Sequence, residues 1–300
     1  FVINNVDEKA NQFSQEFRIT NKTEDEKLNW VAGLYYFTET VDRKDNNDFR
    51  GNDLAVFNTH YPDPNFPFPG ANLVWAQILP ALGQVGWGVA PFNIFWDQYN
   101  ETKSYAAFFQ GTYDLTEQLA LTLGGRYTQE SKDAVINGHG FDPTRGFLAE
   151  TYDVNPSKSW NSFTPKASLD YNFSDDVMVY ASYSEGFKSG GFNGSAASEA
   201  AALAGYNPEE AKQWEIGMKS MFMDNRVRLN LSAFDIDYTD IQIFKLVNGS
   251  TLVIENAADA VSKGFEAELT AAVSETLTLR INYAYLDATY ENYITDKGED

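Results

Sequence analysis

The feature that most constrains the fold of this chain is the stretch from residue 159 to 191, in which two segments of alternating apolar and polar side chains flank one tight polar turn. In the first half, every second position is apolar or small: Phe163, Pro165, Ala167, Leu169, Tyr171 and Phe173. The second half repeats the pattern with Val177, Val179, Ala181 and Tyr183. Successive side chains of a strand point to opposite faces, so each half predicts a strand with one apolar and one polar face. Because the polar residues Ser174, Asp175 and Asp176 separate the two halves, we expect a hairpin with a tight turn.

The same arrangement recurs along the chain. We expect strands at residues 13–20 and 28–40, and three further hairpins whose tight turns begin near residues 116, 224 and 275. The connections between successive hairpins are longer, and an irregular segment from about residue 42 to 102 is the longest. Short turns at one end and long loops at the other are typical of outer-membrane β-barrels, in which the short turns are periplasmic and the long loops extracellular. We therefore predict an all-β fold, an antiparallel transmembrane β-barrel fragment with about ten strands of a larger barrel.

The placement of charge supports a membrane wall. Near the tight turns, all of these charged residues fall in the polar register: Arg18, Arg126, Lys166, Asp170, Lys219, Arg228, Glu266, Glu268 and Arg280. A lysine or arginine facing lipid at the bilayer midplane costs about 2–4 kcal/mol, so the pattern is expected if the apolar face meets lipid and the other face lines a wet lumen. Glu185 and Asp287 share the apolar register, but both lie toward the long-loop end. A soluble two-layer sheet with a dry core remains an alternative, because antiparallel sheets with one wet face also alternate.

One segment departs from the alternation. Apolar side chains occupy Val227, Leu229, Leu231 and Ala233, and then shift by one position to Phe234, Ile236 and Tyr238. One inserted residue moves every following side chain to the other face of a sheet. We therefore infer a β-bulge near Phe234.

Composition excludes several functional classes. The chain has 300 residues with no cysteine and only two histidines, His60 and His139, which leaves little material for a metal or redox centre. Its net charge of −21 excludes general nucleic-acid binding, which needs a basic surface to displace counterions from phosphate. The glycines after Lys188 are not followed by a phosphate-binding helix, and the acidic residues 42–53 lack the spacing of a calcium loop. We therefore predict no metal, no cofactor and no catalytic site.

Several segments together resemble the TonB-dependent receptors of Gram-negative outer membranes. They are SQEFRIT at residues 14–20, LNWVAGLYYF at 28–37, YASYSEGFKSGGFN at 180–193, YNPEEAKQWEIGMKS at 206–220 and AFDIDYTDIQ at 233–242, in the order that the family uses. The resemblance implies a barrel of about 22 strands that is plugged by an N-terminal globular domain. Residues 1–300 would then be one partial barrel domain from its central and later wall, with a long extracellular loop at about 42–102. The family's plug, its TonB-engaging motif and its terminal strand ending in an aromatic residue are not recognisable in these residues.

The resemblance also implies a function, namely active uptake of a scarce nutrient, most often an iron–siderophore complex, across the outer membrane. The partners would be outer-membrane lipid, the small ligand, and the TonB complex acting through the missing N-terminal region. Two other functions stay open: a passive outer-membrane pore or structural barrel, and an outer-membrane hydrolase that uses His60 or His139. The family's haem receptors use a histidine soon after the motif that corresponds to Phe187-Lys188 here. No histidine follows before Tyr206 in this chain, so haem uptake is disfavoured.

Ligand contacts are expected on the longest loop and on the inner wall above the membrane, where aromatic side chains can enclose a ligand. The candidates are His60, Tyr61, Trp75, Trp87, Phe92, Phe95 and Trp96. Each of them has an alternative interpretation, in which it packs within the loop or belongs to an aromatic belt at the membrane interface.

Overall fold

The computed structural model of the chain describes residues 2–21, 27–49, 92–139, 151–196, 198–247 and 251–293. These residues form eleven strands of one sheet and one short helix. The strands are β1 (Val2–Asn21), β2 (Leu28–Phe49), β3 (Phe92–Asp114), β4 (Leu119–His139), β5 (Tyr152–Val154), β6 (Ser157–Ser174), β7 (Val177–Lys188), β8 (Glu209–Phe222), β9 (Val227–Val247), β10 (Thr251–Ser274) and β11 (Leu277–Tyr293), and the helix is α3 (Glu199–Ala204).

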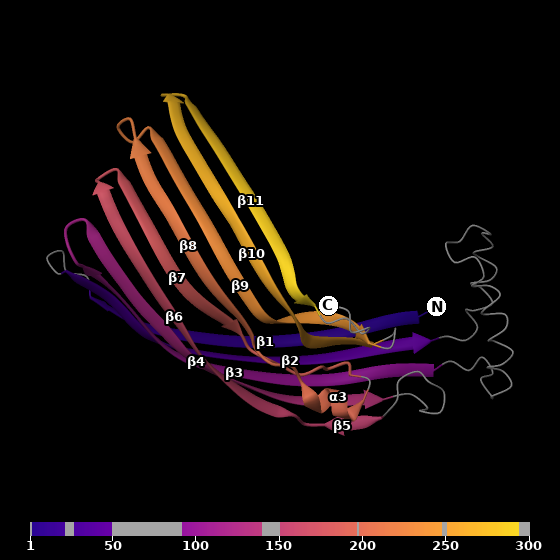
Figure 1. Ribbon diagram of the computed structural model, residues 1–300. Helices are drawn as coiled ribbons and strands as arrows, with labels where there is room; N and C mark the ends of the chain where they lie inside the picture. Colours follow the sequence, from indigo (N-terminus) through magenta and orange to yellow (C-terminus); the bar gives the residue numbers. More distant parts are fainter. Residues whose placement is uncertain are drawn as a thin grey trace, which may run out of the picture.

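The sheet is a curved antiparallel wall in which strands adjacent in sequence are adjacent in space (Figure 1). Its order is β1-β2-β3-β4-β6-β7-β8-β9-β10-β11, and β5 pairs with the end of β4. These ten consecutive strands confirm the predicted fold class, whereas β5 and α3 were not expected. All described strands belong to this single layer, so no second sheet packs against it within the described ranges. Among the described residues, no helix is long and apolar enough to cross a membrane.

The tight turns lie together at one end of the sheet and are fixed by local chemistry (Figure 1). At three of them a hydroxyl accepts a hydrogen bond from a backbone amide two or three residues later: Thr116 from Leu119 (3.0 Å), Ser174 from Asp176 (3.2 Å) and Ser274 from Thr276 (3.3 Å). In such a bond the side-chain hydroxyl replaces a backbone carbonyl as the acceptor of the amide hydrogen, which favours a turn. The fourth turn places Met223, Asp224 and Asn225 in the left-handed region, with φ of 55°, 55° and 63°. All four predicted turns are therefore confirmed.

The two faces of the sheet differ in polarity near the tight turns. One face, called the apolar face, carries exposed hydrophobic side chains that include Phe17, Leu34, Phe109, Leu123, Phe163, Leu169, Ile216 and Leu279. The opposite face, called the polar face, carries the charged residues of the polar register. Arg126 Cζ lies 5.0 Å from the centre of the Tyr35 ring, and Lys219 Nζ lies 5.5 Å from that of Tyr180. At these distances the rings stabilise the two cations by cation–π attraction.

An aromatic row marks the border of the apolar side chains on the side away from the tight turns. Its ring pairs include Phe13–Tyr36 (6.3 Å between centroids), Tyr36–Tyr105 (5.0 Å), Tyr183–Trp214 (4.6 Å) and Phe265–Tyr285 (5.9 Å). Directly beyond the row, the same face becomes charged. Glu185 pairs across the strands with Lys212, and Lys263 Nζ lies 3.0 Å from the Asp235 carboxylate. Amphipathic aromatic rings between apolar and charged bands are typical of a membrane interface.

The bulge inferred near Phe234 is wrong. Phe234 pairs in unbroken register with Glu215 of β8 and with Gly264 of β10. The Phe234 ring covers this glycine, at which an added Cβ would lie 2.7 Å from the ring atom Cζ. The apolar phase shifts because the surroundings change: beyond the aromatic row, the former apolar face carries Asp235 instead of a hydrophobic side chain. The register shifts between β9 and β10 lie elsewhere, within residues 256–260.

The irregular segment expected at residues 42–102 needs a correction at both ends. β2 continues to Phe49 and β3 begins at Phe92, and these two residues are cross-strand partners. Residues 42–49 read DRKDNNDF, without alternation. Such a segment can stay paired through its backbone after the lipid-facing requirement for apolar side chains has ended, so the strand leaves no period-two signal. Residues 50–91 lie outside the described residues.

Candidate functional site

The connection between β7 and β8 folds back over the polar face of the sheet. We call residues 189–208 the strap; it contains α3 and is described apart from residue 197. An antiparallel bridge between Gly191 and Tyr206 joins its two arms. The strap is bonded to β3 and β5 on one flank and to β9 and β10 on the other. It therefore crosses the polar face between strands that are distant in the sheet order.

The first flank holds the strap through the carbonyl oxygen of Ala196. Tyr152 donates its hydroxyl hydrogen to this oxygen at 2.6 Å, and Trp96 Nε1 donates to the same oxygen at 3.3 Å. Gln98 Nε2 donates to Ser195 Oγ at 3.2 Å. Burial raises the pKa of Tyr152 to about 12, so this phenol keeps the proton that it donates at physiological pH.

A small apolar core attaches the middle of the strap to the wall. It consists of Ala134, Ile136, Tyr152, Val154, Ala196 and Ala202, and Phe192 and Ala201 pack against it. Ser198 caps α3, because its hydroxyl accepts a hydrogen bond from Ala201 N at 3.3 Å. The alanines of α3 let the helix approach β4 and β5 closely. The strap is thus packed against the wall as well as hydrogen-bonded to it.

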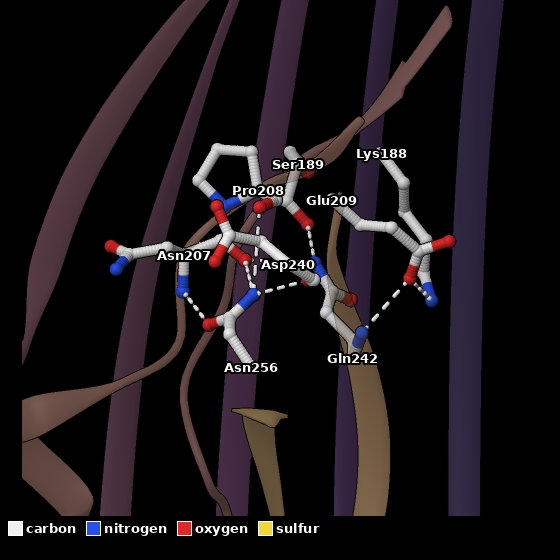
Figure 2. Close-up of polar contacts among 8 residues, drawn as sticks. All are labelled: Lys188, Ser189, Asn207, Pro208, Glu209, Asp240, Gln242 and Asn256. Carbon is white, nitrogen blue, oxygen red and sulfur yellow. Dashed lines mark hydrogen bonds and ion pairs between the residues drawn. The ribbon is translucent and has the colours of Figure 1, made fainter. Parts of the chain in front are cut away.

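The second flank holds the base of the strap with two carboxamides (Figure 2). Gln242 Nε2 donates to the carbonyl oxygens of Ser189 (2.9 Å) and Asn207 (3.0 Å), which lie at the two ends of the strap. Asn256 Oδ1 accepts from Asn207 N at 2.6 Å, and Asn256 Nδ2 donates to Asn207 O at 2.9 Å. These bonds close the loop at its base.

A third carboxamide, Asn193 of the strap, binds the backbone of β10. Asn193 Oδ1 accepts from Ile254 N at 2.7 Å, and Asn193 Nδ2 donates to Ile254 O at 3.1 Å. One side chain thus makes the two hydrogen bonds that a neighbouring strand residue would make. The strap is consequently attached to the second flank along its first arm and at its base.

Trp160 of β6 lies under the start of the strap. Its side chain is buried, and a Cβ added at Gly190 would approach its ring to 2.7 Å, so glycine is needed there for the close passage of the backbone. Lys158 Nζ and Lys132 Nζ lie 5.5 Å and 6.0 Å from the indole ring centre. The buried indole N–H has no hydrogen-bond partner among the described residues. Trp160 therefore offers an unused donor beside two cations.

The charged groups around the strap occur mainly as pairs of opposite sign. Lys132 Nζ lies 3.5 Å from Glu130, which also accepts a hydrogen bond from the Ser189 hydroxyl. Lys188 Nζ lies 3.7 Å from Glu209. In the part of the chain that the structure describes, no three His, Cys, Asp or Glu side chains come together as a metal site. The surface beside the strap thus offers a hydrogen-bond donor, aromatic rings and paired charges.

The structure places only part of the predicted ligand-contact set. His60, Tyr61, Trp75 and Trp87 lie outside the described residues, and Phe92, Phe95 and Trp96 belong to β3. Trp96 reaches the strap, whereas Phe95 occupies the alternate register of the same strand. Sequence reasoning missed the roles of Gln242, Asn256 and Asn193, whose partners lie far away in sequence. Asn193 and Gln242 end two of the family-like segments, but those segments did not indicate what the two side chains bind. The small-residue composition of residues 194–205 was a signal of close packing that could have pointed to the strap.

A comparison with protein-family models matches residues 4–300 to the family described as TonB dependent receptor-like, beta-barrel. Among curated proteins, the ferric-pyoverdine BN7/BN8 receptor of Pseudomonas putida is 25% identical over 181 residues, which is 60% of this chain and 20% of that protein. The ferrichrome outer membrane transporter/phage receptor of Escherichia coli K12 is 26% identical over 182 residues, 61% of this chain and 22% of that protein. The chain thus matches about a fifth of the length of these relatives.

Solved structures show the same fold. The ferric yersiniabactin uptake receptor FyuA of Yersinia pestis superposes with a TM-score of 0.73 at 18% identity, over 98% of this chain and 38% of that protein. The siderophore receptor PiuA of Acinetobacter baumannii superposes with a TM-score of 0.66 at 16% identity, over 96% of this chain and 39% of that protein. At such identities the superpositions establish the architecture of the wall.

Proposed function

Because this chain belongs to the TonB-dependent receptor family, as a part of its β-barrel, we propose that it is the ligand-gathering wall of a receptor that imports a ferric siderophore. The family consists of outer-membrane proteins of Gram-negative bacteria. The chain covers a minor part of its relatives, so the complete receptor would supply further strands and the plug. Residues 1–300 would then be one partial barrel domain whose lumen is completed by those strands.

The distribution of side chains supports the orientation of the wall in the membrane. The apolar face carries an exposed hydrophobic band that is bordered by the aromatic row, and charged residues begin beyond that row. Burial of this band in lipid removes apolar surface from water, and the aromatic rings suit the interface. The tight turns would lie on the periplasmic side, and the strap would lie on the extracellular side of the lumen.

The observation that carries the proposal is the strap itself, which crosses the polar face and is held on both flanks. A passive pore needs an open lumen, whereas a receptor needs a shaped surface inside it. Trp96 and Trp160 lie beside the strap, and we keep His60, Tyr61, Trp75 and Trp87 of the long connection and Phe92 of β3 as candidate contacts. Phe95 is the weakest candidate, because its register places it on the apolar face. The relatives named for ferric pyoverdine and ferrichrome support a siderophore as the ligand class.

Energised transport would use the TonB complex, and the chemistry would be binding and gated passage without a covalent step. The named relatives are receptors and transporters, which supports this reading over the hydrolase alternative. A structural barrel or passive pore is the alternative that the strap argues against.

Uptake of radioactive iron by cells that express the complete receptor tests the proposal. Ferrichrome, ferrioxamine B and ferric pyoverdine are suitable probes, each measured with and without a protonophore. We expect saturable uptake of at least one probe, abolished by the protonophore and by deletion of TonB. Uptake that rises linearly with concentration and survives the protonophore would show a passive pore instead.

A further inference from the structure

The two carboxamides at the base of the strap stand at an irregularity between β9 and β10. Gln242 and Asn256 are cross-strand partners, and the register shifts directly after Asn256. Asp240, two residues before Gln242, adopts the left-handed conformation with φ of 56°, and its amide donates to Asp259 Oδ1 at 3.0 Å. β-Bulges bend a strand and re-aim its side chains. Here the irregularity accompanies two neighbouring side chains that both reach the strap (Figure 2).

Gln242 joins the two ends of the strap. A carboxamide nitrogen carries two hydrogens, and here one contacts the carbonyl oxygen of Ser189 and the other that of Asn207. The backbone amide of Gln242 donates to Glu209 Oε2 at 3.0 Å, which fixes the first residue of β8 beside it. A single residue of β9 thus ties the start and the end of a twenty-residue connection, counted from 189 to 208.

Asn256 also binds the base of the strap, and it does so mainly as a hydrogen-bond donor. Its Nδ2 faces three carbonyl oxygens: Asp240 at 2.7 Å, Asn207 at 2.9 Å and Pro208 at 3.4 Å. An aspartate at this position has the same shape, but when ionised it only accepts hydrogen bonds and would repel these oxygens. The position therefore requires a donor, and side-chain size alone does not satisfy it.

We propose that Gln242 and Asn256 are positioning residues of the receptor, which hold the strap at a fixed place in the lumen so that it forms one side of the ligand site. This inference rests on the uptake function proposed above. Neither residue needs to touch the ligand, because they fix the strap at its base, and the strap then lies over Trp160 at its start and beside Trp96 in its middle. Both bind the strap through carboxamides, which do not ionise, so these hydrogen bonds do not depend on the charge of a titrating side chain.

Thiol labelling of the complete receptor in outer-membrane vesicles tests the hold on the strap. These 300 residues contain no cysteine, so a parent without an introduced cysteine gives the background from the remaining receptor. Ala202 of α3 is fully buried and Leu203 is 46% exposed, so Ala202→Cys should react slowly with a maleimide and Leu203→Cys rapidly. In the Ala202→Cys background, Asn256→Leu and Gln242→Leu should each raise the labelling rate about tenfold, because the strap loses the hydrogen bonds that hold its base.

Two further variants make the labelling result specific. Asn256→Asp should label as fast as Asn256→Leu, because the missing donor is what matters. Asn230→Leu is the matched control: Asn230 belongs to the same β9 surface, bonds only to Glu268 in the polar contacts described (3.3 Å), and should leave the rate unchanged. If neither Asn256→Leu nor Gln242→Leu accelerates labelling, or if Asn256→Asp stays as slow as the parent, the assigned role is wrong.

Uptake of iron-loaded ferrichrome, ferrioxamine B and ferric pyoverdine tests the link to the ligand site, with receptor abundance measured in every strain. Asn256→Leu and Gln242→Leu should raise the half-saturation concentration about tenfold at an unchanged maximal rate, while Asn230→Leu should behave as the parent. Faster labelling with an unchanged half-saturation concentration would overturn the positioning role. If the parent imports none of the probes, the siderophore function fails, and the labelling rates alone decide whether these residues hold the strap.

Discussion

The half of the sheet near the tight turns and the half near the strap use the same backbone pairing with opposite side-chain arrangements. In the first half, Leu169 and Ile216 are exposed on the apolar face. In the second half, that face carries Asp235 and Lys263, and the polar face buries Ile136 completely under the strap.

This difference shows that backbone pairing and side-chain pattern are determined by different constraints. Hydrogen bonds between strands continue through both halves, because backbone groups need partners in lipid and in water alike. The side chains instead follow the medium that each face meets. Hydrophobic side chains therefore lie on the apolar face in the half that contacts lipid. In the other half they lie on the polar face, where the strap covers them and forms a small core.

The largest effect that tests this comparison comes from a charge placed in each half of one strand. Leu123 and Val135 both project from β4 in the same register and are 53% and 40% exposed. Leu123→Arg should destabilise the folded receptor in the bilayer by about 2–4 kcal/mol, because it places a cation in the lipid-facing band. Val135→Arg should change stability by less than about 0.5 kcal/mol, because it lies beyond the aromatic row. Denaturant titration of the receptor in vesicles measures both, and equal losses would break the distinction.

Removal of core volume beneath the strap should have a smaller and more local effect. Ile136→Ala leaves a cavity at a fully buried site and should weaken the attachment of the strap by about 2–3 kcal/mol. Hydrogen exchange should then accelerate in residues 189–208 but not in the hairpin of β6 and β7. Ile216→Ala, on the exposed apolar face, is the control and should leave exchange in the strap unchanged. Acceleration throughout the sheet would show that the two halves unfold together.

High pH should release the strap before it affects the membrane half. Burial raises the pKa of Tyr152 from its ordinary value of 10.0 to about 12, so the folded state keeps a proton that the detached state loses. The attachment is therefore at full strength below pH 10 and weakens as the pH rises from 10 to 12. The rate of Ala202→Cys labelling as a function of pH measures this release of the strap. The exposed Leu203→Cys calibrates the pH dependence of the labelling reaction itself. Burial also raises the pKa of Tyr206 in the strap, so Tyr152→Phe should shrink the pH step and Tyr206→Phe gives the other contribution. A step of unchanged size in Tyr152→Phe would assign it to another group.

The smallest effect is expected at the charged band beyond the aromatic row. Lys263 and Asp235 form an exposed pair, and exposed pairs contribute little because water and salt screen them. Asp235→Ala should leave the unfolding midpoint of the receptor in vesicles unchanged within error. A clear loss of stability would mean that this band is not in contact with water.

Sequence patterns predicted the wall because its decisive constraints are local. The alternation from Phe163 to Tyr183 predicted the hairpin and its two faces, and Ser174 predicted the turn that its hydroxyl closes. The same reasoning wrongly predicted a β-bulge at Phe234. The apolar pattern shifts by one residue there because the surroundings of the two faces change, and an inserted residue would produce the same shift. It also ended β2 too early, since a strand with both faces in polar surroundings has no alternation to detect.

The amino-acid sequence by itself determined which face of each strand is apolar, where the chain reverses, and which family it resembles, because these depend on side chains a few residues apart. Only the tertiary structure decided what the polar face holds. Asn256 and Asn207 are 49 residues apart, and Trp96 and Ala196 are 100 apart. The curvature and register of the whole wall bring such partners together, and no short segment of sequence encodes them. The hairpin of β6 and β7 could therefore be predicted, whereas the partners that hold the strap could not.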